Sequence, residues 1–239
     1  MKKILLLQFR TDSSLAHEVK CITEKLGVER EQLDIYNTLD PSVILPKPGD
    51  LTRYSGVITG ASGQFFISNW PDEIRIPIER TLPLFLEIVR RDMPMLAICF
   101  GHQIIAKLLG GEVERDSAQS ETGTLTVRLN EAGRAAAIFK DIPEKFNVVL
   151  AHKDSVIKLP TGAKLLAYSQ RCRIQAYQIG KNIFATQFHA ELNLDDMVWR
   201  LQLYPDYLKE KTLQQLRSQY QEITFAQKIL ENFKNMTVF

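Results

Sequence analysis

Features typical of several protein classes are scarce or missing in this 239-residue chain. Its three cysteines are far apart and form no CxxC pair, so the sequence indicates no disulfide framework and favours a reducing cytoplasm as the compartment. The formal net charge is only +2, which gives no general reason to expect nucleic acid or a membrane surface as a partner.

Long hydrophobic runs are also missing. No segment approaches the roughly 20 apolar residues that a membrane-spanning helix needs. Residues 2–10 are similar to the start of a signal peptide, but the apolar core is short and polar residues follow at once, so we expect a first strand there. Because no repeat, low-complexity tract or linker divides the chain, we expect one domain over residues 1–239.

The first half of the chain alternates between strand-like and helix-like patterns. This alternation predicts an α/β fold with a parallel sheet and helices on both faces. Residues 64–72 are expected to form a surface segment. The expected strands are residues 4–9, 33–36, 56–59 and 95–98, and the expected helices are residues 15–26, 82–91 and 104–109.

The second half has more strand-like runs, separated by turn signals. The last two strands are typical of a hairpin, which would deliver residues 188–191 at a strand end. A final amphipathic helix is expected over residues 223–233. The expected strands are residues 125–129, 148–151, 164–168, 174–179 and 183–187.

The sequence around Cys99 predicts a sharp corner between a strand and a helix, because residues 95–98 leave no room for a loop before the helical pattern. A residue at such a corner has strained backbone geometry and lies at the positive end of the helix, where the pKa of a thiol is lowered. The small residues Ala97 and Gly101 suit a tight corner. The local pattern is compatible with a nucleophile and with an inert buried cysteine.

A thiol nucleophile needs a base and a group that orients the base. Two His-x-acid pairs offer both, namely His152 with Asp154 and His189 with Glu191. In extended backbone, residues two apart point to the same side, so either acid can fix the tautomer of its histidine. The residue pattern leaves the two pairs equal. The four residues match no specific metal-binding spacing, and we expect no metal site.

The other two histidines are expected to have no catalytic role. His17 is expected to be a surface residue without a partner. His102 lies three residues after the cysteine, and we expect it to pack or cap the new helix.

Acyl chemistry also needs hydrogen-bond donors for an oxyanion. The backbone N–H of Phe100, directly after the cysteine, is one natural donor. A second donor is expected from the loop at residues 60–63, at a neighbouring strand end. Taken alone, this loop would be interpreted as a plain β-turn.

Together these segments resemble the class I (triad-type) glutamine amidotransferases over most of the chain. Residues 97–103 resemble the nucleophile motif of that family, and residues 186–191 resemble its His-x-Glu motif. Residues 60–63 fall where the family has a Gly-Gly-Pro oxyanion strand, and residues 151–156 are similar to a segment of guanylate-synthase-type members. The resemblance implies a flavodoxin-like, three-layer fold with a mostly parallel central sheet.

The resemblance also implies a mechanism without a cofactor. A Cys-His-Glu triad of Cys99, His189 and Glu191 would cleave the γ-amide of glutamine or of a γ-glutamyl compound through a glutamyl thioester. The implied oxyanion donors are Gly60 or Ala61 and Phe100, and the implied substrate-binding residues are Gln103, Ser120, Glu121 and Gly123.

The chain departs from the family pattern at several positions. Ala61 and Ser62 replace the second glycine and the proline of Gly-Gly-Pro, so the oxyanion loop is expected to have a different shape or to need substrate to set its conformation. Ala97 replaces a common glycine, and Ala190 a usual proline. Residues 192–222 form an insertion before the closing helix, which we expect to be a surface helical hairpin; a lid or a subunit contact is the alternative.

Three functions are compatible with these residues. The first is a glutamine-hydrolysing enzyme that passes ammonia to a synthase partner protein, since nothing in the chain resembles a nucleotide-binding P-loop. The second is a stand-alone hydrolase of γ-glutamyl peptides. The third is a non-catalytic family member that binds a metabolite or a partner, against which the intact triad argues.

Overall fold

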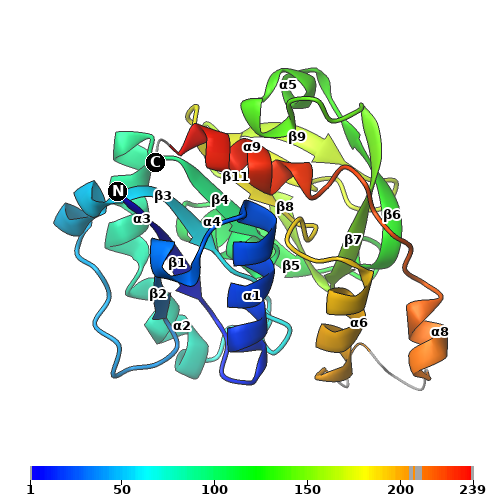
Figure 1. The fold of residues 1–239 in the computed structure, drawn as a ribbon, viewed down its shortest axis with the longest axis horizontal. Coiled ribbons are helices and arrows are strands. Elements are labelled where there is room, and N and C mark those ends of the chain that lie inside the picture. Colours follow the sequence, from blue (N-terminus) through cyan, green and yellow to red (C-terminus); the bar gives the residue numbers. More distant parts are fainter. Residues whose placement is uncertain (1, 205–206, 208–211, 238–239) are drawn as a thin grey trace.

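The computed structural model describes residues 2–204, 207 and 212–237. Its centre is a nine-stranded sheet with the order β2-β1-β3-β4-β11-β10-β9-β6-β7 (Figure 1). The parallel part consists of β2 (Leu33–Asn37), β1 (Lys3–Gln8), β3 (Tyr54–Thr59), β4 (Met95–Ile98) and β11 (Ile183–Thr186). The antiparallel part adds β10 (Ala176–Ile179), β9 (Lys164–Tyr168), β6 (Glu121–Leu129) and β7 (Lys145–His152).

Helices cover both faces of the sheet, because the strands bury apolar side chains on both sides. In β1, Ile4 and Leu6 belong to one apolar cluster and Leu5 and Leu7 to the other. The first cluster includes residues of α1 (Ser14–Leu26) and α9 (Lys228–Met236). The second includes residues of α2 (Asp72–Glu79), α3 (Leu82–Arg91) and α4 (Phe100–Leu108). The predicted α/β class is confirmed.

Smaller elements complete the chain, and the sequence pattern did not indicate most of them. The helix α2 was not expected because Pro77 lies inside it, and its Asp72 ends the expected surface segment. None of the described helices is long and apolar enough to cross a membrane. The remaining elements are the two-stranded sheet of β5 (Glu112–Arg115) and β8 (Asp154–Lys158), the helices α5 (Glu131–Ala135), α6 (Leu194–Gln202) and α8 (Leu213–Arg217), and the 3-10 turns Arg30–Gln32, Pro48–Arg53 and Ala137–Phe139.

Three parallel strands bring the motifs together. The carboxyl ends of β3, β4 and β11 meet at one edge of the sheet, so the loop at residues 60–63, Cys99 and the segment 187–191 become neighbours. The Cys99 N–H donates a hydrogen bond to the Thr186 carbonyl at 2.7 Å and so continues the β4–β11 pairing to the corner.

The insertion contributes the helices α6 and α8, which contact each other, and one side of it packs against the domain. Tyr204, Tyr207 and Tyr220 are all buried. The Tyr220 hydroxyl donates to the Leu150 carbonyl at 2.9 Å, and the Gln219 carbonyl accepts from the β6 backbone. Residues 205–206 and 208–211 of the insertion lie outside the described residues.

Candidate active site

Cys99 occupies the expected corner between β4 and α4. Its backbone has φ 49° and ψ −100°, a left-handed conformation that is strained for a residue with a side chain. Gly101 makes the corner possible, because a Cβ at this position would lie 2.2 Å from the Thr59 hydroxyl oxygen. Phe100 is the first residue of α4, where a backbone N–H has no acceptor within the helix.

His189 lies next to Cys99 and is oriented by Glu191. The His189 Nδ1 and the Glu191 Oε1 are 2.8 Å apart, and both side chains are buried. Burial lowers the pKa of His189, but Glu191 and Cys99 outweigh it and raise the pKa to about 9. Burial raises the pKa of Glu191, but His189 and Arg200 lower it to about 2. The arrangement favours an imidazolium beside the sulfur and a carboxylate behind it.

The other His-x-acid pair does not form. His152 Nδ1 is 3.0 Å from the backbone carbonyl of Asp154, whereas the Asp154 carboxylate accepts from the Ser68 N–H and hydroxyl, each at 2.7 Å. His152 Nε2 lies 3.5 Å from Glu121. The tertiary contacts therefore separate two pairs that the residue pattern left equal.

The substrate-binding positions carried over by resemblance have other partners. Gln103 is buried, and its Nε2 donates to the Asp154 carbonyl at 2.9 Å and to the Gln187 Oε1 at 3.0 Å. Gln187 in turn donates to the Cys99 Sγ at 3.5 Å. Gln103 thus supports a residue that contacts the nucleophile. The sequence motif contains Gln187 but gave no signal of this contact.

The segment 120–123 likewise serves the interior of the domain. The Ser120 hydroxyl donates to the Lys153 carbonyl at 2.9 Å, and the buried Glu121 accepts from the Ser169 hydroxyl at 2.7 Å and from Gln175. Gly123 has φ +123°, and its face is covered by the Gln219 carbonyl.

The two expected donors in the loop after β3 already have acceptors. The Gly60 N–H donates to the Leu7 carbonyl at 2.9 Å, and the Ala61 N–H donates to the Glu18 Oε1 at 2.9 Å. Neither N–H is free for an oxyanion in this geometry. The physical reason is that Glu18 of α1 is buried against this loop, where a smaller or apolar side chain would have left Ala61 unpaired.

A family model for class-I glutamine amidotransferases matches residues 40–197, which include β3, the Cys99 corner and the His189–Glu191 pair. The chain belongs to the class-I glutamine amidotransferase family. It is therefore an enzyme of a family whose chemistry is cysteine-based amide hydrolysis, as predicted.

Relatives in this amidotransferase family include proteins of two kinds. Gamma-glutamyl peptidase 4 of Arabidopsis thaliana is 30% identical over 97% of this chain and 95% of its own length. The glutamine-hydrolysing GMP synthase of Borreliella burgdorferi is 37% identical over 46% of this chain and 21% of its own length. A solved glutamine amidotransferase from Thermotoga maritima has the same fold, with a TM-score of 0.76 and 21% identity over 100% of both chains.

A small cavity of about 20 Å³, with room for little more than a water molecule, lies beside His189 in this amidotransferase. It is bounded on one side by Ser62 and Gly63 of the loop after β3 and on the other by Arg200 of α6. The insertion therefore forms a wall of the space next to the catalytic histidine candidate.

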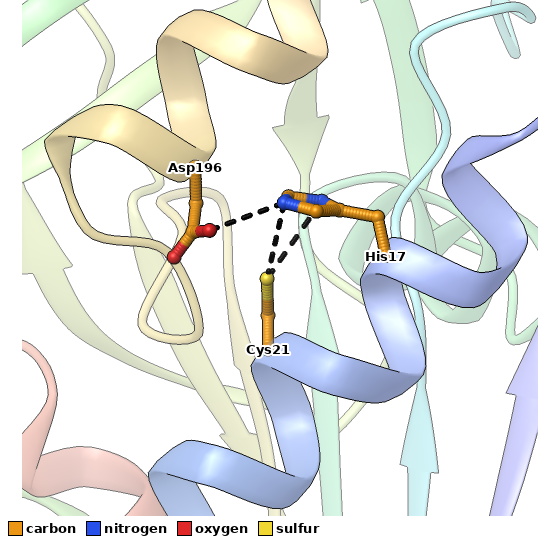
Figure 2. A group of neighbouring side chains, drawn as sticks. All are labelled: His17, Cys21 and Asp196. Atoms are coloured by element: carbon orange, nitrogen blue, oxygen red, sulfur yellow. Dashed lines mark hydrogen bonds and ion pairs between the residues drawn. The ribbon is translucent and has the colours of Figure 1, made fainter.

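Two groups of side chains have metal-ligand chemistry in the described part of the chain. One is His17, Cys21 and Asp196, which Figure 2 shows between α1 and α6. His17 Nδ1 accepts from Arg200 at 3.2 Å and Nε2 lies 3.1 Å from Asp196, so both ring nitrogens are engaged. Burial raises the pKa of the Cys21 thiol to about 12. The other is Glu121, His152 and Cys172, where Glu121 and His152 contact each other and further polar groups.

Proposed function

We propose that this amidotransferase-family enzyme hydrolyses γ-glutamyl amides with Cys99 as nucleophile, His189 as base and Glu191 as its orienting carboxylate. The observation that carries this assignment is the buried contact of 2.8 Å between His189 and Glu191, directly beside a cysteine held at a strained strand–helix corner. These are the parts of a thiol-based acyl transfer site.

The reaction would run in two stages. The Cys99 thiolate attacks the γ-carbonyl carbon, and the resulting oxyanion accepts from the Phe100 N–H. Because Ala61 is engaged by Glu18, we place the second donor one or two residues further on, at Ser62 or Gly63, which border the cavity beside His189. His189 then gives its proton to the leaving amine. Water, deprotonated by His189, attacks the glutamyl thioester and releases glutamate and the thiol.

We favour γ-glutamyl peptides as the substrates, hydrolysed without a synthase partner. The match to the Arabidopsis peptidase extends over 95% of that protein, whereas the match to the GMP synthase covers 21% of the synthase. The second candidate is glutamine hydrolysis with transfer of ammonia to a synthase partner protein, which the similarity to GMP synthase supports. The three unpaired thiols suit a reducing cytoplasm for either reaction.

The test combines labelling with a comparison of substrates. An electrophilic glutamine analogue should form its adduct on Cys99, and Cys99→Ala should lose turnover while it keeps the thermal unfolding midpoint of the wild type. Labelling at Cys21 or Cys172 alone would reject the assignment. Faster cleavage of γ-glutamyl dipeptides than of glutamine supports the peptidase; the reverse result supports the ammonia donor.

A further inference from the structure

Arg200 of the insertion contacts the same oxygen atom as the histidine of the proposed triad. Its Nη1 donates to the Glu191 Oε1 at 2.9 Å, and His189 Nδ1 lies 2.8 Å from that oxygen. Arg200 and Glu191 are 3% and 1% exposed, so solvent screens this ion pair little. The carboxylate therefore has two cationic partners, one on the loop after β11 and one on α6.

The guanidinium is itself held in place from its other side. Arg200 Nε donates to the His17 Nδ1 at 3.2 Å, and His17 Nε2 lies 3.1 Å from the Asp196 Oδ1 (Figure 2). Trp199 stacks on the His17 ring with 4.3 Å between the ring centroids. His17 is thus a half-buried link between α1 and α6, which corrects its expected role as a surface residue without a partner.

We propose that Arg200 is a positioning residue that holds Glu191 in its orienting geometry and keeps it ionised, with His17 and Asp196 fixing the guanidinium. This inference rests on the proposed function of the triad. In that reaction His189 alternates between a charged and a neutral ring. Whenever the ring is neutral, Glu191 would be a buried carboxylate without a cation, a costly state that the permanent charge of Arg200 avoids.

The insertion has a clear role under this proposal, because it supplies Arg200, Asp196 and Trp199 to one side of the site. The groups that face Glu191 and Arg200 come from several elements, and each contributes to the local charge. They are His189 and Cys99 at the site, Arg10 after β1, His17 and Cys21 on α1, and Asp196 and Tyr204 in the insertion.

The test compares the pH profiles of kcat/KM for the wild type and Arg200→Met, with the better of glutamine and a γ-glutamyl dipeptide as substrate. Removing the cation raises the pKa of Glu191, so the acid limb should move to higher pH by about one unit. At pH values on that limb kcat/KM should fall by up to about tenfold, mainly through kcat. Arg200→Lys keeps the charge and should restore most of the loss.

Two further variants make the result decisive. Arg217→Met removes an exposed cation of the same insertion, paired with Asp195, and should leave the profile unchanged. If Arg200→Met does not fold, His17→Ala serves instead: it removes the acceptor of Arg200 and should shift the acid limb in the same direction by a smaller amount. An unshifted profile in these variants would overturn the role of Arg200, whereas activity in Cys99→Ala would overturn the triad itself.

Discussion

The backbone N–H of Ala61 donates a hydrogen bond to the buried carboxylate of Glu18 at 2.9 Å. The same carboxylate accepts from Arg10 at 3.0 Å and from Gln8 at 3.1 Å, so α1, the end of β1 and the loop after β3 meet at one charged group. A Cβ on the neighbouring Gly60 would lie 2.4 Å from Glu18 Oε2, which explains a glycine there. The loop of the proposed oxyanion site is therefore shaped by a side chain from a distant helix.

Glu18→Gln should destabilise the protein strongly. The substitution leaves Arg10, which is 1% exposed, as a buried charge without its counter-ion, and breaking such a pair typically costs about 3–5 kcal/mol. Chemical denaturation at neutral pH measures the change. Glu24→Gln on the same helix is the matched control, since its pair with Lys20 is exposed and should contribute under about 1 kcal/mol. Equal effects of the two substitutions would contradict the assigned role of Glu18.

Gly101→Ala should disturb the Cys99 corner. The added Cβ would overlap Thr59, whose backbone oxygen is also only 2.9 Å away, and overpacking of this kind costs about 1–3 kcal/mol. Because Thr59 cannot move without β3, the corner must shift, and the alkylation rate of Cys99 should fall together with stability. Gly49→Ala is the control, with no atom within 4 Å of the new Cβ. If Cys99 were alkylated in Gly101→Ala at the same rate as in the wild type, the steric argument would be refuted.

The pH dependence of the unfolding free energy should reveal the ion pair at His189. Its pKa of about 9 lies above the usual value of 6.5, so the charged ring contributes stability that is complete below the usual value and is lost as pH rises through about 9. The unfolding free energy should therefore decrease over this window more in the wild type than in His189→Gln. Glu191→Gln should lower the pKa of His189 and move the decrease to lower pH. Parallel pH curves for the wild type and both variants would argue against the pair.

Gly123→Ala should loosen the attachment of the insertion to β6. A Cβ there would lie 2.8 Å from the Gln219 carbonyl oxygen, in addition to the strain of φ +123°. Gly162→Ala is the control, because that glycine has φ +79° and nothing within 4 Å of the new Cβ. The difference between the two variants isolates the contact with the insertion. Limited proteolysis should cut within the insertion faster in Gly123→Ala alone.

Local sequence patterns were sufficient to predict the features that depend on residues close together in the chain. The apolar runs of β4 and β11 and the small neighbours of Cys99 predicted a strand–helix corner, and the corner is where the pattern indicated. The alternation of strands and helices predicted the class of fold for the same reason, since hydrophobic periodicity depends on neighbours in sequence. The motif resemblance predicted the family, which the match over residues 40–197 confirms.

Contacts between distant segments could not be derived in this way. Two His-x-acid pairs with identical spacing had equal standing by residue pattern, and the family resemblance alone favoured His189 and Glu191. The structure adds the physical difference: Asp154 is engaged by Ser68, whereas Glu191 contacts His189. The contact between Gln103 and Gln187, which are 84 residues apart in the chain, follows only from the folded structure.

By itself, the sequence determined the class of fold, the position of the cysteine corner and the family, because each depends on side-chain types at fixed short spacing. The tertiary structure decided which acid holds which histidine, which N–H groups after β3 are already bonded, and that the insertion packs against the proposed site. Those outcomes depend on Glu18 and Arg200, which are far from Cys99 in the chain and become buried partners of the site only when the helices pack on the sheet.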